Sequence, residues 1–187
     1  MKLATKRIIC LYGGSSCGKS TACAGLYYKL KLLGYECEMN REYIKDWIWE
    51  NRAPKDGDQS YFFAKMARRE RLYIQSNLDF IITDSPLILT HFYGLKNDRY
   101  EQLTNTSLAM LENHHLYCVE NGYKIDHFFL KRCKKYSESG RYQTEEEAKV
   151  FDEEIKSMLA QFNINYKEIN SDKNVAENLL GELGRNY

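Results

Sequence analysis

Residues 13–20 read GGSSCGKS, a spacing of glycines, a lysine and a hydroxyl that is typical of a phosphate-binding loop. Glycines allow the backbone to curl so that successive N–H groups point at phosphate oxygens. The side chain of Lys19 would neutralise the outer phosphates, and the hydroxyl of Ser20 would bind Mg²⁺. A glycine-rich turn with a solvated lysine is the alternative. The pattern predicts a site for a phosphate-bearing nucleotide made of Gly13, Gly14, Ser15, Ser16, Cys17, Gly18, Lys19, Ser20 and Thr21.

Two acidic side chains follow segments that are expected to be strands. Asp84 ends the apolar run FIITD, and open α/β sheets place their ligands at the carboxyl ends of such strands. Its carboxylate could bind Mg²⁺, or it could only cap the turn before Pro86. Glu42 could accept a proton from an attacking hydroxyl or hold the acceptor, although the helix dipole also favours an acidic residue in a first turn. Both are candidate catalytic residues, and the sequence leaves open which of them is the base.

A basic segment, KRCKKYSESGRY at 131–142, follows a later apolar run. It has no apolar period, which is typical of an exposed and mobile segment. Arginines on such a segment could clamp the γ-phosphoryl oxygens during transfer, and Arg132 and Arg141 are the candidates. Its lysines are expected to be solvated, and a plain charged loop would explain the whole segment as well.

Two pairs of polar residues lie outside these motifs. Arg68 and Arg71 would share one face of a helix, where they could bind an anionic group of the acceptor or simply be solvated. His114 and His115 have no ligand partners at a suitable spacing and are expected at the surface.

The segments between these residues alternate between short apolar runs and amphipathic stretches. This alternation predicts an α/β fold with right-handed crossovers and a parallel sheet of about five strands, covered by helices on both faces. A capping box at Thr144 and Glu147 predicts a helix that reaches Phe162, and residues 95–107 are expected to be a loop. The spacing predicts strands at 6–12, 35–39, 80–83, 125–130 and 165–169. Further helices are predicted at 21–34, 41–50, 59–75, 108–119 and 176–183.

The composition limits the class of protein. The 187 residues fit a single domain, 1–187, and 27 basic against 26 acidic residues leave a net charge of +1. A near-neutral chain disfavours a large DNA footprint. The apolar run near the N-terminus is too short for a signal peptide or a membrane-spanning helix, so we expect a cytoplasmic protein with no membrane partner.

Six cysteines are scattered without a CxxC pair, which argues against a zinc site and against a disulfide framework. They are expected to be reduced, with Cys10 and Cys37 in the core. Cys17 lies inside the phosphate-binding loop, either as a small residue that fits there or as a thiol whose lowered pKa would make nucleotide binding redox-sensitive.

With these motifs in place, the chain resembles the P-loop kinase-like family that includes the ribosylnicotinamide kinase domain of bacterial NadR proteins and AAA-type ATP-binding proteins common in phages. The resemblance spans most of the chain and rests on GGSSCGKST, REYIKDW, QSYFFAKMARRE, FIITDSP and the FLKR…GRYQTEEEA region. It implies a nucleoside or nucleotide kinase fold in which residues 13–20 hold ATP, Asp84 and Glu42 serve the metal and the acceptor, and residues 131–143 form a lid. After the strand at 80–83, where this chain has DSP, the nicotinamide riboside kinases of the family resemble one another in having DTD. This difference argues against a nicotinamide substrate.

The predicted activity is an ATP- and Mg²⁺-dependent transfer of the γ-phosphoryl group to a hydroxyl of a nucleoside or nucleotide-like small molecule. One alternative acceptor is a hydroxymethylated pyrimidine in DNA, as for some phage kinases of this class. Another alternative is a binding switch in which ATP or GTP orders the lid for a partner, although the chain has no N-K-x-D motif for guanine. The acceptor pocket is expected between residues 43–75 and 95–107. Neither the acceptor nor the oligomeric state follows from the sequence.

Overall fold

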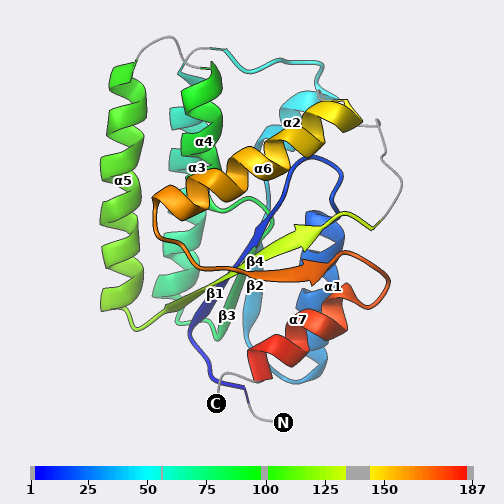
Figure 1. The fold of residues 1–187 in the computed structure, drawn as a ribbon. Coiled ribbons are helices and arrows are strands. Elements are labelled where there is room, and N and C mark those ends of the chain that lie inside the picture. Colours follow the sequence, from blue (N-terminus) through cyan, green and yellow to red (C-terminus); the bar gives the residue numbers. More distant parts are fainter. Residues whose placement is uncertain (1–2, 56, 98–100, 134–143, 185–187) are drawn as a thin grey trace.

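The computed structural model describes residues 3–55, 57–97, 101–133 and 144–184, and within them five strands form one sheet (Figure 1). The strands are β1 (Arg7–Tyr12), β2 (Cys37–Asn40), β3 (Phe80–Thr83), β4 (Lys124–Lys131) and β5 (Lys167–Asn170). In space they follow the order β2-β3-β1-β4-β5, and every neighbouring pair is parallel. The sheet, with helices on both faces, confirms the α/β fold class that the sequence predicts.

Two helical layers cover the sheet. The helices are α1 (Lys19–Leu32), α2 (Ile44–Trp49), α3 (Asp58–Gln75), α4 (Leu87–Asn97), α5 (Glu101–Glu120), α6 (Glu145–Gln161) and α7 (Val175–Gly184). The helices α1 and α7 pack together on one face, whereas α3, α4, α5 and α6 lie on the other (Figure 1). In the part of the chain that the structure describes, none of these helices is both long and apolar enough to cross a membrane.

Alternate residues of β1 face the two helical layers. Ile9 and Leu11 lie in a core cluster with residues of α1 and α7. Ile8 and Cys10 lie in a second cluster with residues of α3, α4, α5 and α6. A strand that is buried on both faces explains the continuous apolar run in the sequence. Because β1 is held from both sides, the loop that follows it starts from a fixed position.

A buried ion pair closes the opposite end of β1. Two guanidinium nitrogens of Arg7 donate to the two carboxylate oxygens of Asp126 in β4, at 2.5 and 2.8 Å. The third nitrogen donates to the carbonyl of Leu183 in α7 at 3.0 Å. A buried ion pair is stabilising only when further hydrogen bonds satisfy its polar atoms, and this bidentate geometry meets that condition. Arg7 therefore joins the central strand, its neighbour and the last helix.

One region differs from the sequence prediction. Most of residues 95–107, expected to be a loop, are helical, since α4 ends at Asn97 and α5 begins at Glu101. The Asn, Asp, Thr and Ser residues of this region favour turns in isolation, but burial of Phe92 from α4 and Cys118 from α5 in the core overrides that preference. The expectation that His114 lies at the surface is also wrong, because its side chain is buried. Three further expectations hold: His115 is exposed, Cys10 and Cys37 are buried, and Thr144 and Glu147 form the capping box of α6.

Candidate functional site

The loop of residues 13–18 joins β1 to α1 at the carboxyl edge of the sheet. Three of its residues have positive φ angles, Gly13 at 133°, Ser16 at 61° and Gly18 at 97°. A Cβ atom on Gly18 would also overlap the hydroxyl of Ser171, so glycine is required there for its space as well as for its backbone. The loop thus leads directly into the N-terminus of α1, where free N–H groups favour a bound anion.

Lys19 lies across this loop. Its ammonium donates to the carbonyl oxygens of Gly13 at 2.6 Å and Gly14 at 2.9 Å. Burial lowers the pKa of Lys19, but the nearby Cys17, Tyr93, Glu42 and Asp84 raise it, and the net shift is upward. Lys19 is therefore positively charged at neutral pH and is available to pair with phosphate oxygens.

The two candidate acids meet at the ends of the neighbouring strands β2 and β3. The backbone N–H of Glu42 donates to a carboxylate oxygen of Asp84 at 2.9 Å. Asp84 is buried, whereas Glu42 is half-buried. The structure thus brings together two residues that the sequence places 42 positions apart. Both carboxylates lie close enough to Lys19 to favour its charged form, while their roles as metal ligand and base stay predictions.

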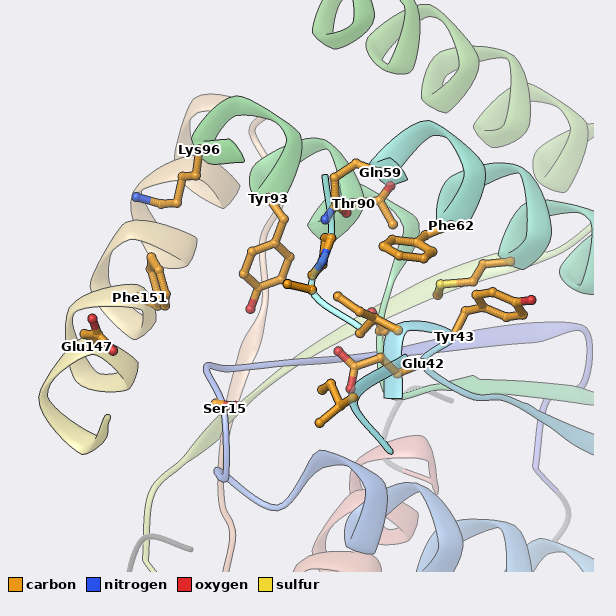
Figure 2. A pocket seen from close by; sticks show the side chains of 16 residues that line it. Ser15, Glu42, Tyr43, Gln59, Phe62, Thr90, Tyr93, Lys96, Glu147 and Phe151 are labelled. Atoms are coloured by element: carbon orange, nitrogen blue, oxygen red, sulfur yellow. The ribbon is translucent and has the colours of Figure 1, made fainter. Parts of the chain in front are cut away.

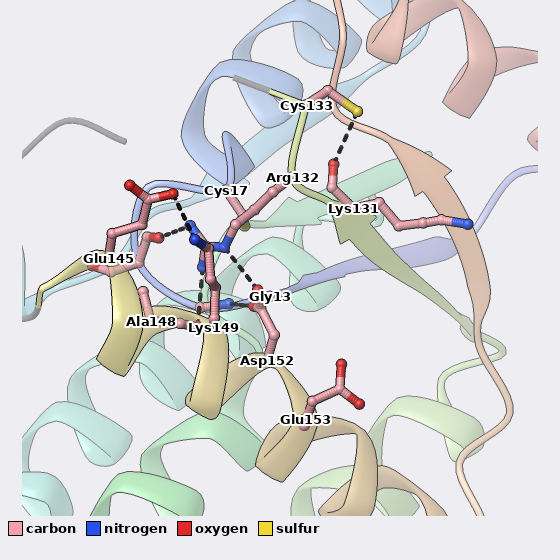
Figure 3. A network of polar contacts seen from close by, with 12 residues as sticks. Gly13, Cys17, Lys131, Arg132, Cys133, Glu145, Ala148, Lys149, Asp152 and Glu153 are labelled. Atoms are coloured by element: carbon pink, nitrogen blue, oxygen red, sulfur yellow. Dashed lines mark hydrogen bonds and ion pairs between the residues drawn. The ribbon is translucent and has the colours of Figure 1, made fainter. Parts of the chain in front are cut away.

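A polar network ties the phosphate-binding loop to α6 (Figure 3). The guanidinium of Arg132, at the end of β4, donates to Asp152 at 2.8 Å and to the carbonyl oxygens of Ser15 at 2.5 Å and Ala148 at 3.2 Å. The other carboxylate oxygen of Asp152 accepts from the N–H of Gly14 at 2.5 Å. Arg132 and Asp152 are only 15% and 14% exposed. Arg132 therefore contacts the backbone of the phosphate-binding loop directly, and its predicted catalytic role stays a prediction.

The remaining predicted residues have varied environments. Ser20 and Thr21 are exposed in the first turn of α1, and Ser15 is half-buried within the loop. Cys17 is buried, with its sulfur 3.9 Å from the ammonium of Lys19. Arg141, Lys134, Lys135 and most of the predicted lid at 131–143 lie outside the described residues.

A cavity of about 330 Å³ opens beside the phosphate-binding loop (Figure 2). It lies between Ser15 of the loop, Glu42 and the helices α2, α3, α4 and α6. Figure 2 shows Glu42, Gln59 and Tyr93 around the same space. Aromatic rings form much of its wall, contributed by Tyr43, Phe62, Tyr93 and Phe151, and polar side chains of Gln59, Thr90, Lys96 and Glu147 also line it. Such a pocket suits a planar molecule with polar edges.

The side of the cavity next to α2 is built from aromatic contacts. The rings of Trp47 and Phe62 meet edge to face, with centroids 4.8 Å apart, and Tyr43 and Tyr61 share a hydrogen bond between their hydroxyls at 3.2 Å. The guanidinium of Arg52 lies 3.9 Å from the centre of the Trp47 ring. These contacts hold α2, which has no buried residue of its own, against α3.

Several residues of the site were missed in the sequence. The acceptor pocket was expected between residues 43–75 and 95–107, and the first of these segments does line the cavity. The opposite wall comes from α4 and α6, and among the described residues of 95–107 only Lys96 contributes. Asp152 was also missed. The sequence holds one clue to Asp152: it lies one helical turn after the small residue Ala148, so the two residues share a face of α6. In the structure this face packs against the loop.

Comparisons with known proteins agree with this architecture. A family model described as an AAA domain matches residues 8–177. Comparison with curated proteins gives no match. Solved structures share the fold. A deoxyadenosine kinase from M. mycoides with bound dATP is 19% identical, with a TM-score of 0.54 over 95% of this chain and 99% of that one.

Two further structures are similar. The NadR protein in complex with NR is 16% identical, with a TM-score of 0.59 over 90% of this chain and 46% of that one, so the chain spans about half the length of NadR. APE1195 is 15% identical, with a TM-score of 0.50 over 99% of both chains. These low identities establish the fold alone. The chain belongs to the AAA-domain family whose model covers residues 8–177, and its fold is that of the P-loop kinases.

Proposed function

We propose that this protein transfers the γ-phosphoryl group of ATP, with Mg²⁺, to a hydroxyl of a nucleoside-like acceptor. The observation that carries the proposal is the shared cavity: Ser15 of the phosphate-binding loop, Glu42 and the aromatic wall line one space. A nucleotide on the loop and an acceptor between the rings would therefore face each other across Glu42. Transfer between two bound substrates depends mainly on such positioning.

The residues divide the chemistry among themselves. The acceptor oxygen attacks the γ-phosphorus, the bond from that phosphorus to the β–γ bridging oxygen breaks, and ADP leaves. The carboxylate of Glu42 accepts the proton of the acceptor hydroxyl. Lys19 and the N-terminus of α1 stabilise the charge on the phosphate oxygens. Ser20 and Asp84 offer the oxygen ligands that Mg²⁺ prefers, and Mg²⁺ bound there would neutralise further charge.

The lining of the pocket supports a nucleoside-like acceptor. Phe62, Tyr93 and Phe151 provide aromatic surface for a planar base. Gln59 is 6% exposed and lines the same cavity, so its amide could donate and accept hydrogen bonds at the edge of a base. The fold is shared with a deoxyadenosine kinase and with a NadR protein in complex with NR, which is consistent with this class of acceptor.

The test is a transfer assay with γ-labelled ATP or GTP, Mg²⁺ and a panel of nucleosides, nucleotides, nicotinamide riboside and hydroxymethyluracil-containing DNA. We expect label on a nucleoside-like member of the panel. Glu42→Gln should lower kcat by about 10²- to 10⁴-fold while leaving ATP affinity unchanged, since only the base is lost. Glu50→Gln, an exposed neighbour at the end of α2, is the matched control.

The same assay can reject the proposal. If no acceptor is labelled above the background of a Lys19→Ala variant, and a protein partner binds only to the nucleotide-loaded form, the binding switch replaces the kinase. If only hydroxymethylated DNA is labelled, the acceptor class changes and the phosphoryl transfer stands.

A further inference from the structure

Three side chains with metal-binding atoms meet between α3 and α5, outside the cavity of the proposed active site. Glu70 belongs to α3, and His114 and Cys118 lie one turn apart on α5. An oxygen, a nitrogen and a sulfur from these residues all lie within 4.8 Å of one another. Their exposed fractions are 4%, 5% and 0%. The sequence argued against a zinc site, because the cysteines form no CxxC pair. It could not reveal this cluster, because Glu70 is 44 positions from His114.

The hydrogen bonds of the cluster are incomplete. Nε2 of His114 lies 2.7 Å from one carboxylate oxygen of Glu70, and the amide of Asn40 donates to the other at 3.1 Å. The amide also donates to the carbonyl of Met66 at 3.2 Å. Nδ1 of His114 is buried, and among the described residues it has no hydrogen-bond partner. A buried ring nitrogen without a partner is costly. Because Nε2 is the nitrogen that faces Glu70, an ion bound to both residues would replace the hydrogen bond at Nε2.

The donor set indicates the kind of partner. Carboxylate oxygen, imidazole nitrogen and thiolate sulfur are the ligands of Zn²⁺, whereas Mg²⁺ and Ca²⁺ take oxygen ligands. Zinc bonds of about 2.0 to 2.3 Å place tetrahedral ligand atoms roughly 3.3 to 3.8 Å apart. Here the three atoms lie within 4.8 Å of one another, and Nε2 of His114 is 2.7 Å from Glu70, so binding would require the side chains to move. The carboxylate and the thiolate would balance both charges of the ion, so that no net charge is buried.

We propose that Glu70, His114 and Cys118 bind one Zn²⁺ ion, with a water molecule as the fourth ligand. On binding, the S–H bond of Cys118 breaks, its proton passes to solvent, and a sulfur–zinc bond forms. A groove of about 710 Å³ between α3 and α5, lined by Ala67, Met110, Asn113 and His114 among others, reaches the cluster at His114, and the ion would enter from there. Asn40 orients Glu70 from behind, as outer hydrogen-bond partners do in metal sites.

The zinc site has a structural consequence. It would join α3 to α5, and through Asn40 it would reach the end of β2, two residues before Glu42. Met66, whose carbonyl accepts from Asn40, also lines the proposed acceptor pocket. The ion would thus brace the wall of that pocket without touching either substrate. This inference is independent of the proposed phosphoryl transfer.

The test is a titration of the chelator-treated full chain with Co²⁺, a spectroscopic substitute for Zn²⁺, in the absence of nucleotide. We expect one equivalent to give the absorption of tetrahedral cobalt together with a thiolate-to-cobalt charge-transfer band. The band should be lost in Cys118→Ser and kept in Cys133→Ser, which alters the exposed cysteine. It should also be kept in Lys19→Ala, which separates this site from the nucleotide site.

A second measurement keeps the test decisive if Cys118→Ser does not fold. Glu70→Gln retains the thiol and should weaken zinc binding at least tenfold, with unchanged circular dichroism. Zinc at 100 times its Kd should raise the Tm of the wild-type chain by about 5 °C or more. No thiolate band in the wild-type chain, a band that survives in Cys118→Ser, or no rise in Tm would overturn the proposal.

Discussion

The phosphate-binding loop and the acceptor pocket lie next to each other but are built in opposite ways. The loop takes its glycines and Lys19 from one short segment, residues 13–19, between a strand and a helix. The pocket takes its walls from residues as far apart as Tyr43 and Phe151, on four helices. The difference teaches that the site for the proposed phosphate donor is encoded locally, whereas the pocket for the proposed acceptor is formed by tertiary packing.

The two regions also differ in how firmly they are held. The loop backbone is fixed at Gly14 and Ser15 by Asp152 and Arg132. The helix α2 beside the pocket has no buried residue. Among the described residues, its side chains contact α3 through aromatic rings, such as Trp47 against Phe62. Substitutions in the loop should therefore affect all substrates, and substitutions in the pocket should affect the acceptor selectively.

The largest effect is expected from Lys19→Ala. Removal of the ammonium takes away the positive charge beside the phosphate oxygens, so transfer from ATP should fall by about 10³-fold or more for every acceptor. The measurement is the rate of γ-phosphoryl transfer. Lys31→Ala, at the other end of α1, should leave that rate unchanged. Equal rates for the two variants would mean that Lys19 has no part in phosphoryl transfer.

Asp152→Ala should weaken ATP binding by about 10- to 100-fold, because it leaves the N–H of Gly14 and the guanidinium of Arg132 without their partner. Isothermal titration with a non-hydrolysable ATP analogue measures this. A double-mutant cycle with Arg132→Ala should give a coupling energy of about 0.5 to 3 kcal/mol. The exposed pair Lys149–Glu145 on the same helix is the control and should give about 0.5 kcal/mol or less. Similar coupling energies for both pairs would contradict the prediction that Asp152 and Arg132 act together to hold the loop.

Gln59→Leu should raise the KM for the acceptor by about tenfold and leave ATP affinity unchanged, because the lost amide would contact only the acceptor. Steady-state kinetics with each substrate varied in turn separates the two effects. The control is Gln75→Leu, an exposed substitution at the end of the same helix. A parallel loss of ATP affinity would show that the two regions are not independent.

The smallest effect is expected from Trp47→Leu. It removes the edge-to-face contact with Phe62, which is worth about 0.5 to 1.5 kcal/mol, so the acceptor KM should rise by about two- to tenfold. Thermal unfolding should change by no more than a few degrees, since α2 adds little buried surface. An unchanged KM would mean that the contact of Trp47 with Phe62 does not help to position the acceptor.

The sheet could be predicted because the signals of its strands are short in sequence. A doubly buried strand appears as a continuous apolar run, and the loop and Asp84 each follow such a run directly. Glu42 follows the shorter and more polar strand β2. The partners of Arg132 could not be predicted in the same way. Ser15 is 117 positions away from it, and only the fold brings the two together.

The histidine prediction failed for a related physical reason. With residues 95–107 assigned to a loop, the start of α5 was misplaced, and the face of the helix that carries His114 and Cys118 could not be recognised as buried. Turn-forming residues reduce the helix propensity of this region, but propensity is a weak signal against burial of an apolar face. A buried polar cluster on such a face follows from packing, which spacing within α5 does not reveal.

The ion pair of Arg7 has a consequence for how the chain is made. Its second partner, the carbonyl of Leu183, is 176 positions later in the sequence. At the usual rate of synthesis of about 5 to 20 residues per second, roughly 10 to 35 s separate the two residues on the ribosome. Asp126 matches the charge of Arg7, but the central strand, which leads into the phosphate-binding loop, gains the last hydrogen bond of that guanidinium only when α7 has been made. Loss of α7 by premature termination would leave the nucleotide-binding motif complete, but the central strand would lack the hydrogen bond from Arg7 to Leu183.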